Sequence, residues 1–288
     1  MPLTLRRDRL ELTLAPDQGG SILSFRHGDF DLLRPAEGSG NVRTHAAFPL
    51  VPYSGRIDHG RFTFQGREYR VPPNFPPEPH AIHGEGWMQA WTVERADTES
   101  ATLAFEHVSP GGVFAYRAEQ RFSLHPDRLE VALAVTHRGD SPMPYGLGLH
   151  PYLVRRPDSL LSAEVSGVWI PDDTNIPRRL EPVPVEWGFR LRRNVNELEL
   201  DHNFPGWGGT ARVDWPDERV SLVIEADPIF RNLVVYVPKG RPYFCVEPAS
   251  HVADGFNLMA RGVKDTGVRV LEPGETLAGT VRFGVQRP

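Results

Sequence analysis

A carboxylate stands at the end of an apolar strand near the C-terminal end of the sequence. Phe244-Cys245-Val246 leads directly into Glu247, and Pro248 follows at once. A carboxyl group in that position is partly desolvated, which raises its pKa and makes it a usable general base near neutral pH. The alternative is a strand-end acid that pairs with an arginine. We interpret Glu247 as the candidate base and ask which residues the fold could place opposite it.

Two upstream segments could deliver a histidine to that place. The run Tyr145–Tyr152 carries two glycines among apolar residues and then His150, and glycine in a strand suggests that something approaches the backbone closely. A histidine there can hold its proton near neutral pH and act as a general acid. His83 lies in a His-Gly-Glu-Gly-Trp run whose glycines leave room for a ligand, and Trp87 offers an apolar ring face to a sugar. The alternative for His150 is a core histidine with a satisfied hydrogen bond. The alternative for His83 is a loop histidine that stabilises its turn.

Two further polar residues could bind a ligand rich in hydroxyl groups. Arg56, within Pro52–Ile57, carries a planar fork of donors that could hold such a ligand or orient a carboxylate. Asp201, within Leu198–Phe204, could accept hydrogen bonds from two sugar hydroxyls. A surface arginine and an exposed loop acid are the ordinary alternatives. With the candidate base and acid, these residues indicate an acid/base site for a sugar.

Motifs of other enzyme classes are absent from the sequence. His80 and His83 stand in a proline-rich loop with no helix to present them to a metal, and no His-Glu-x-x-His occurs. No nucleotide-binding glycine motif and no Gly-x-Ser-x-Gly elbow is found. Cys245 is better explained as a buried small residue than as a nucleophile. We therefore expect neither a metal nor a cofactor.

Short strands must position these residues, because no stretch shows a helical stripe across three turns. The 27 glycines and 28 prolines are distributed along the chain, where they separate short runs rich in residues that favour β-strands. We predict strands at 10–14, 61–64 and 68–71 (a hairpin), 91–95, 101–107, 116–124, 129–136, 211–215, 220–226, 233–237, 243–246 and 277–283, and a short helix within 250–261. Residues 48–83 outside the hairpin, and residues 171–209, are expected to be long loops that carry function. The pattern predicts an all-β fold, a large antiparallel β-sandwich or barrel with few short helices, and one domain over residues 1–288.

Composition restricts the partners and the location. The single cysteine excludes an internal disulfide and favours a reducing, cytoplasmic setting. The basic N-terminal residues are not followed by an apolar segment, so we expect no signal peptide, and no apolar run approaches the roughly 20 residues that span a bilayer. The net charge is −5 without a basic stripe, so nucleic acid and anionic membranes are poor partners. The oligomeric state is left open.

Taken together, six segments resemble the aldose 1-epimerase (galactose mutarotase) family. In chain order they are Pro49–Ile57, Gly60-x-Phe62-x-Phe64, Ile82-His83-Gly84, Gly148-Leu149-His150-Pro151-Tyr152, Leu200-Asp201-His202-x-Phe204 and Val246-Glu247-Pro248. Each is weak alone, but six in order, from about residue 10 to the C-terminus, are specific. The resemblance implies the family's large antiparallel β-sandwich with one open sugar-binding cleft and no cofactor.

The resemblance also implies roles for the matching residues. Glu247 corresponds to the base that takes the proton of the anomeric hydroxyl, and His150 to the acid that protonates the ring oxygen. His83, Arg56 and Asp201 correspond to residues that hold hydroxyls and the ring oxygen. Departures occur around the cleft: Gly55 replaces a common asparagine, residues 153–156 differ from the usual Phe and Asn, and a common Thr-Gly pair near 177–179 is missing. These changes leave the identity of the sugar open.

Three functions are compatible with these observations. The first is an aldose 1-epimerase that acts on a free hexose or pentose. The second is a sugar-phosphate 1-epimerase, such as a hexose-6-phosphate 1-epimerase, with a phosphate pocket made by loop arginines at 155, 156, 178 and 179. The third is a non-catalytic sugar-binding or sensor protein, which would not need both Glu247 and His150.

Overall fold

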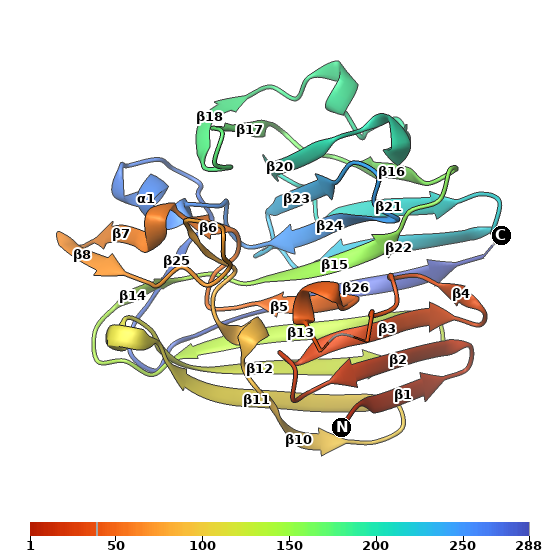
Figure 1. Cartoon of the computed structure of the whole chain (residues 1–288), viewed down its shortest axis with the longest axis horizontal. Coiled ribbons are helices and arrows are strands. Elements are labelled where there is room, and N and C mark those ends of the chain that lie inside the picture. The colour runs from red at the N-terminus through yellow and green to blue at the C-terminus, as the bar shows by residue number, and fades with distance from the viewer. Residues whose placement is uncertain (39, 288) are drawn as a thin grey trace.

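Two large antiparallel β-sheets make up the structure, a computed structural model that describes residues 1–38 and 40–287 (Figure 1). In spatial order the first sheet contains β1 (Leu3–Arg7), β2 (Leu10–Ala15), β3 (Ser21–His27), β5 (Ala47–Leu50), β15 (Gly148–Val154), β24 (Tyr243–Ala249), β23 (Asn232–Val237), β20 (Leu200–Pro205), β17 (Val168–Pro171) and β18 (Pro177–Glu181), with β4 (Phe30–Asp31) beside β3. The second contains β10 (Thr92–Ala96), β11 (Ser100–Val108), β12 (Ala115–Leu124), β13 (Arg128–His137), β26 (Thr276–Gln286), β22 (Val220–Ala226), β21 (Thr210–Trp215), β16 (Leu160–Ala163) and β19 (Arg193–Asn194). The predicted all-β antiparallel sandwich is confirmed.

Apolar side chains between the two sheets form the core. Strands such as β13 alternate buried and partly buried residues along their whole length, as expected when one face of a sheet is covered. Phe25 of β3 contacts Phe283 of β26 with ring centroids 6.4 Å apart, and Phe30 of β4 contacts Trp215 of β21 at 5.2 Å. Aromatic pairs in this range add to the stability gained from burial.

Small elements complete the fold. They are the two-stranded pairs β6 (Arg56–Ile57) with β9 (Ala81–Ile82), β7 (Arg61–Phe64) with β8 (Arg67–Arg70), and β14 (Met143–Tyr145) with β25 (Arg269–Leu271); the helix α1 (Gly255–Ala260); and the 3₁₀ turns η1 (Val42–Thr44), η2 (Asp58–Gly60), η3 (Gly86–Met88), η4 (Pro110–Gly112), η5 (Val185–Trp187) and η6 (Val195–Glu197). The β7–β8 pair is the predicted hairpin, and Gln65 and Gly66 at its turn both have positive φ, as a tight hairpin turn requires. The predicted short helix is α1.

The prediction of a loop over residues 171–209 is wrong in part, because the segment contains β18, β19 and β20. In β20 the fully buried apolar residues are Leu200 and Phe204, four positions apart, with polar residues between them. That spacing hides the period-two pattern by which strands are recognised. Consequently Asp201 lies on a strand of the first sheet and not in a loop.

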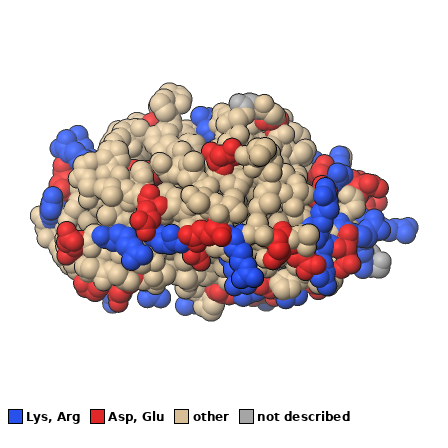
Figure 2. Space-filling view, turned by 90° about the horizontal axis from the view of Figure 1, so that it is seen from below, with Lys and Arg blue, Asp and Glu red and all other residues tan. Residues whose placement is uncertain are grey.

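The surface mixes both signs of charge. Basic and acidic side chains are interspersed on the face shown in Figure 2. Within residues 1–38 and 40–287, no helix has the length and apolar character needed to cross a bilayer.

A buried histidine supports the segment that leads to β6. His251 is 2% exposed; its Nε2 accepts a hydrogen bond from the Ser54 N–H at 3.0 Å, and its Nδ1 lies 2.7 Å from the carbonyl oxygen of Val252. The pair of contacts fits a neutral ring whose Nδ1 carries the proton. A Cβ at Gly146 would stand 1.9 Å from the ring, so the close approach expected of the glycines before His150 is present there.

Lowering the pH from 7 to 5 should weaken the fold through His251. Burial lowers its pKa to about 4, so below about 6.5 the unfolded chain takes up a proton that the folded chain does not. The stabilisation of the folded state by neutral His251 is fully present above about pH 6.5. The free energy of unfolding then falls by about 2 kcal/mol as the pH is lowered to 5. Urea unfolding across this range would measure it. The His251→Gln variant should lose less stability on acidification by that amount, and an unchanged pH dependence would contradict the assignment.

Candidate active site

Two rows of side chains cross the face of the first sheet that points away from the second sheet. The register that pairs Gly148 with Ala249, and Tyr152 with Cys245, sets His150 beside Glu247. Side chains two residues apart share a face, so this face of β24 shows Cys245 and Glu247 together. One row therefore contains, strand by strand, Phe48, His150, Glu247, Val234 and Asn203, and the other contains Tyr152, Cys245, Tyr236 and Asp201.

The predicted base and acid are in contact. His150 Nε2 lies 3.4 Å from Glu247 Oε1, and the two residues are only 7% and 2% exposed. The residue opposite Glu247 is thus a histidine and not an arginine. His150 Nδ1 and Glu247 Oε2 have no hydrogen-bond partner among the described residues. The alternative interpretation, a core histidine with satisfied hydrogen bonds, does not fit. One polar atom of His150 and one of Glu247 are buried without a hydrogen-bond partner among the described residues.

Burial sets the protonation of this pair. It raises the pKa of Glu247 well above its usual range, with the charge of Asp201 adding to the effect and Arg56 opposing it. It lowers the pKa of His150 to about 3, and the nearby charge of Arg34 adds to this shift. Burial therefore favours the neutral form of both groups in the free protein. The expectation that His150 keeps its own proton near neutral pH is not met in the free protein.

His83 lies against the Glu247–His150 pair. Its ring meets the His150 ring edge to face, with centroids 5.2 Å apart. His83 Nδ1 accepts a hydrogen bond from the Gly55 N–H at 3.1 Å, which leaves Nε2 as the donor of a neutral ring. Burial, followed by the charges of His150 and Arg56, lowers the pKa of His83 well below its usual value. The residue both stabilises its turn and offers one N–H to a ligand.

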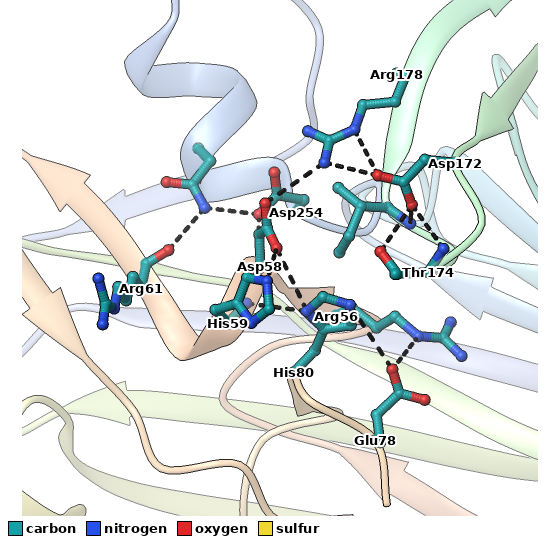
Figure 3. A network of polar contacts seen from close by, with 12 residues as sticks. Arg56, Asp58, His59, Arg61, Glu78, His80, Asp172, Thr174, Arg178 and Asp254 are labelled. Carbon is teal, nitrogen blue, oxygen red and sulfur yellow. Dashed lines mark hydrogen bonds and ion pairs between the residues drawn. The ribbon is translucent and has the colours of Figure 1, made fainter.

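Arg56 and Asp201 are held together beside the pair. Arg56 Nη2 lies 3.7 Å from Asp201 Oδ2. Arg56 Nε donates to Glu78 Oε1 at 3.2 Å, as Figure 3 shows. The arginine side chain is 16% exposed, so it is not an ordinary surface arginine. Buried His80 accepts from the His59 N–H through Nδ1, and its Nε2 is 3.9 Å from the Glu78 carboxylate. Glu78, which the sequence did not single out, thus positions Arg56.

Trp87 does not present the ring face predicted for a sugar. It is 7% exposed, its indole N–H donates to the Gly84 carbonyl, and its ring packs against Phe48 and Phe75 at 5.9 and 6.2 Å. Aromatic rings that do contact the candidate acid are Phe48, 4.8 Å from the His150 ring, and Tyr152, 4.5 Å from it. Trp87 therefore packs behind Phe48 and supports the apolar side of the site.

Arg34 is a further group that sequence reasoning missed. Its guanidinium lies 3.5 Å above the Tyr152 ring, and Tyr152 in turn stacks on His150 with centroids 4.5 Å apart. Its Nε and Nη2 donate to the carbonyl oxygens of His45 and Arg43. The period-two spacing of Tyr152 from His150 could have shown that the two share a face, but nothing in the sequence links Arg34 to them.

The loop arginines of the predicted phosphate pocket have other partners. Arg155 donates to the Pro238 carbonyl and to Asn196. Arg178 pairs with Asp172 at 2.7 Å, as Figure 3 shows, and Arg179 pairs with Glu181. The guanidinium of Arg156 lies 6.0 Å from the Phe30 ring. These contacts do not build one cationic pocket at the Glu247–His150 pair.

Comparison with known proteins places this site in a family. The sequence model of one protein family, described as aldose 1-epimerase, matches residues 2–284. The chain belongs to the aldose 1-epimerase family. The uncharacterized protein YphB of Escherichia coli (strain K12) is 33% identical over 291 residues, which are 98% of each chain.

Solved structures agree with the family assignment. The crystal structure of a protein of Escherichia coli K12, provisionally called an aldose 1-epimerase, matches with a TM-score of 0.93 and 32% identity over 100% of this chain and 99% of that one. A galactose mutarotase-like protein of Clostridium acetobutylicum matches with a TM-score of 0.88 over 99% and 95% of the two chains, and at 18% identity it shows the fold alone. The resemblance predicted from six segments is thereby confirmed.

Proposed function

We propose that the protein is an aldose 1-epimerase, a mutarotase that interconverts the α and β anomers of a free hexose or pentose. One observation carries the proposal: a buried carboxyl group and a buried imidazole face each other at 3.4 Å. Mutarotation needs one group that accepts a proton and one that donates it. Family membership implies an isomerase that acts on a sugar.

The reaction moves protons only. Glu247 takes the proton of the anomeric hydroxyl while His150 gives its proton to the ring oxygen, and the C1–O bond of the ring breaks. The aldehyde turns about the C1–C2 bond, and closure on the other face returns both protons with the roles reversed. The step begins with a carboxylate and an imidazolium and leaves a protonated carboxyl and a neutral imidazole. Burial favours the neutral imidazole of His150 in the free protein, so the acid role of His150 requires that it gain a proton when a cyclic sugar enters.

The surrounding residues would bind the sugar. We assign His83 Nε2–H and the guanidinium of Arg56 as donors to hydroxyls or the ring oxygen, and Asp201 as an acceptor from hydroxyls. Phe48 supplies the apolar surface next to His150, and Trp87 holds that ring in place. We further propose a reducing, cytoplasmic location, on the evidence of the single buried thiol of Cys245.

NMR magnetisation exchange between anomers tests the proposal directly. Glucose, galactose, arabinose, xylose and glucose 6-phosphate would be measured with and without the protein. Selective acceleration of one free sugar supports the proposal and names the substrate. Acceleration of the phosphate alone would favour the sugar-phosphate epimerase, whose predicted arginines are engaged elsewhere. No acceleration, with binding seen by calorimetry, would leave a sugar-binding protein.

Replacing the carboxylate that positions Arg56 should weaken sugar binding. Glu78→Gln removes the charged partner of Arg56 Nε, so we expect the KM to rise about tenfold with little change in kcat. Anomer exchange over a range of sugar concentrations separates the two constants. Glu181→Gln is the matched control, because Glu181 pairs with Arg179 at 3.2 Å and should leave both constants unchanged. An unaltered KM in Glu78→Gln would show that Asp201 alone suffices to hold the arginine.

A further inference from the structure

Three potential metal ligands lie close together in the candidate active site. One ligand atom each of His150, Cys245 and Glu247 lies within 4.8 Å of the other two, and all three residues are buried. Cys245 and Glu247 stand two residues apart on β24, and His150 faces them from β15. The mechanism above uses His150 and Glu247 but assigns nothing to the thiol.

The donors of this cluster suit one class of ion. An imidazole nitrogen, a thiolate sulfur and a carboxylate oxygen are the ligands of four-coordinate Zn²⁺, which often keeps water in its fourth position. Mg²⁺ and Ca²⁺ prefer sites made of oxygen ligands and would gain little from the nitrogen and the sulfur. A neutral imidazole with one thiolate and one carboxylate also balances the two positive charges of the ion, which matters in a site shielded from water.

The geometry comes close to what the ion requires. Ligands around a tetrahedral zinc ion lie roughly 3.3–3.8 Å apart, given metal–ligand bonds of about 2.0–2.3 Å. His150 Nε2 and Glu247 Oε1 are already 3.4 Å apart, and the ligand atoms of all three residues lie within 4.8 Å of one another, so an ion would require only a small contraction of the cluster. Glu247 Oε2 has no hydrogen-bond partner among the described residues, which leaves the carboxyl group free to turn toward an ion.

We propose that His150, Cys245 and Glu247 form an inhibitory site for Zn²⁺ or a similar thiophilic divalent cation. Binding displaces the protons of the thiol and the carboxyl group and forms three metal–ligand bonds, with water as the fourth ligand. The ion then occupies the base and the acid together, so it competes with the sugar. This inhibitory effect depends on the proposed function, whereas the binding of the ion does not.

The site is built for reversible binding and not for a resident metal. Ligating histidines ordinarily donate their second ring N–H to a partner that fixes the ring. His150 Nδ1 has no such partner among the described residues. We therefore expect a lower affinity than that of structural zinc sites, with full recovery of activity when the ion is removed by a chelator.

Co²⁺ in place of Zn²⁺ gives a readout that does not require activity. The expected result is binding of one ion per chain, with the visible absorption of four-coordinate Co²⁺ and a near-ultraviolet thiolate-to-metal charge-transfer band. Cys245→Ser should abolish the charge-transfer band and weaken affinity more than about tenfold. Cys245→Ala serves as a second variant, and thermal unfolding establishes that each variant is folded.

A second cluster of the chain provides the matched control. Asp58, His59 and His80 also bring ligand atoms within 4.8 Å of one another, and the His59 side chain is 67% exposed. His59→Asn should leave the Co²⁺ spectrum and the inhibition by Zn²⁺ unchanged. A six-coordinate spectrum without the charge-transfer band, or equal affinity in Cys245→Ser, would overturn the proposal, and so would loss of binding in His59→Asn.

The activity measurement adds an independent test. Zn²⁺ should raise the apparent KM for the sugar without lowering the rate at saturating sugar, and Cys245→Ser should keep the uninhibited rate while resisting the ion. If the protein accelerates no anomer exchange but the Co²⁺ spectrum has the expected form, the proposed function fails and the metal site stands. If exchange is fast and neither ion binds, the metal site fails alone.

Discussion

Glu247→Gln is expected to lower the rate of anomer exchange by about 100-fold or more while sugar binding is kept. Glutamine has nearly the same shape as glutamate, so the contact with His150 and the packing of β24 can persist. It has no carboxylate to take the proton of the anomeric hydroxyl. The substitution therefore removes proton transfer and leaves the residues that bind the sugar in place.

NMR exchange for turnover and calorimetry for binding would separate these effects. Glu130→Gln is a suitable control, because Glu130 lies on β13 in the second sheet and pairs with Arg128. It should leave both measurements unchanged. Turnover near that of the wild type in Glu247→Gln would remove Glu247 from the role of base, and loss of binding with loss of turnover would show that its main role is to hold the sugar.

The local sequence singled out both members of the candidate acid/base pair. Glu247 was chosen because it ends an apolar strand just before a proline, and His150 because it follows two glycines in an apolar run. The structure places them side by side because β15 and β24 are neighbours in the first sheet. Which strands pair is a property of the whole fold, and the spacing within one segment does not contain it. The resemblance to the family supplied that missing information.

Groups whose role depends on distant contacts could not be predicted in the same way. Arg34 reaches His150 only through the stacked ring of Tyr152, and Glu78 reaches Arg56 from a proline-rich loop. The neutrality of His150 depends on burial by many neighbours, which no local pattern reports. The prediction of one domain over the whole chain stays a prediction.

Trp87 illustrates the opposite error. A tryptophan in a glycine-rich segment next to His83 was interpreted as a ring face for a sugar. In the fold its indole N–H is bonded to the backbone of its own loop, and its ring is covered by Phe48 and Phe75. Large aromatic rings contribute much buried area, so a position near a site does not by itself make such a ring accessible.

His150→Asn should also reduce anomer exchange by about 100-fold or more, and it provides a test of whether the two residues act as one unit. Asparagine keeps a polar side chain in place of the imidazole, but its amide ends short of the position of Nε2 and cannot protonate the ring oxygen. Thermal unfolding and sugar binding by calorimetry would establish that the variant is folded and that its site is intact. Undiminished activity would reassign the acid, with His83 as the nearest other imidazole at 5.2 Å between ring centroids.

The double variant Glu247→Gln/His150→Asn gives the sharpest result. Because the two residues face each other at 3.4 Å and act in one proton transfer, removing either already stops that transfer. The double variant should therefore be slower than the slower single variant by no more than a few-fold. If the two losses multiplied instead, each residue would act with a different partner. The buried pair would then be a structural contact, and the proton path would have to be sought through His83 and Arg56.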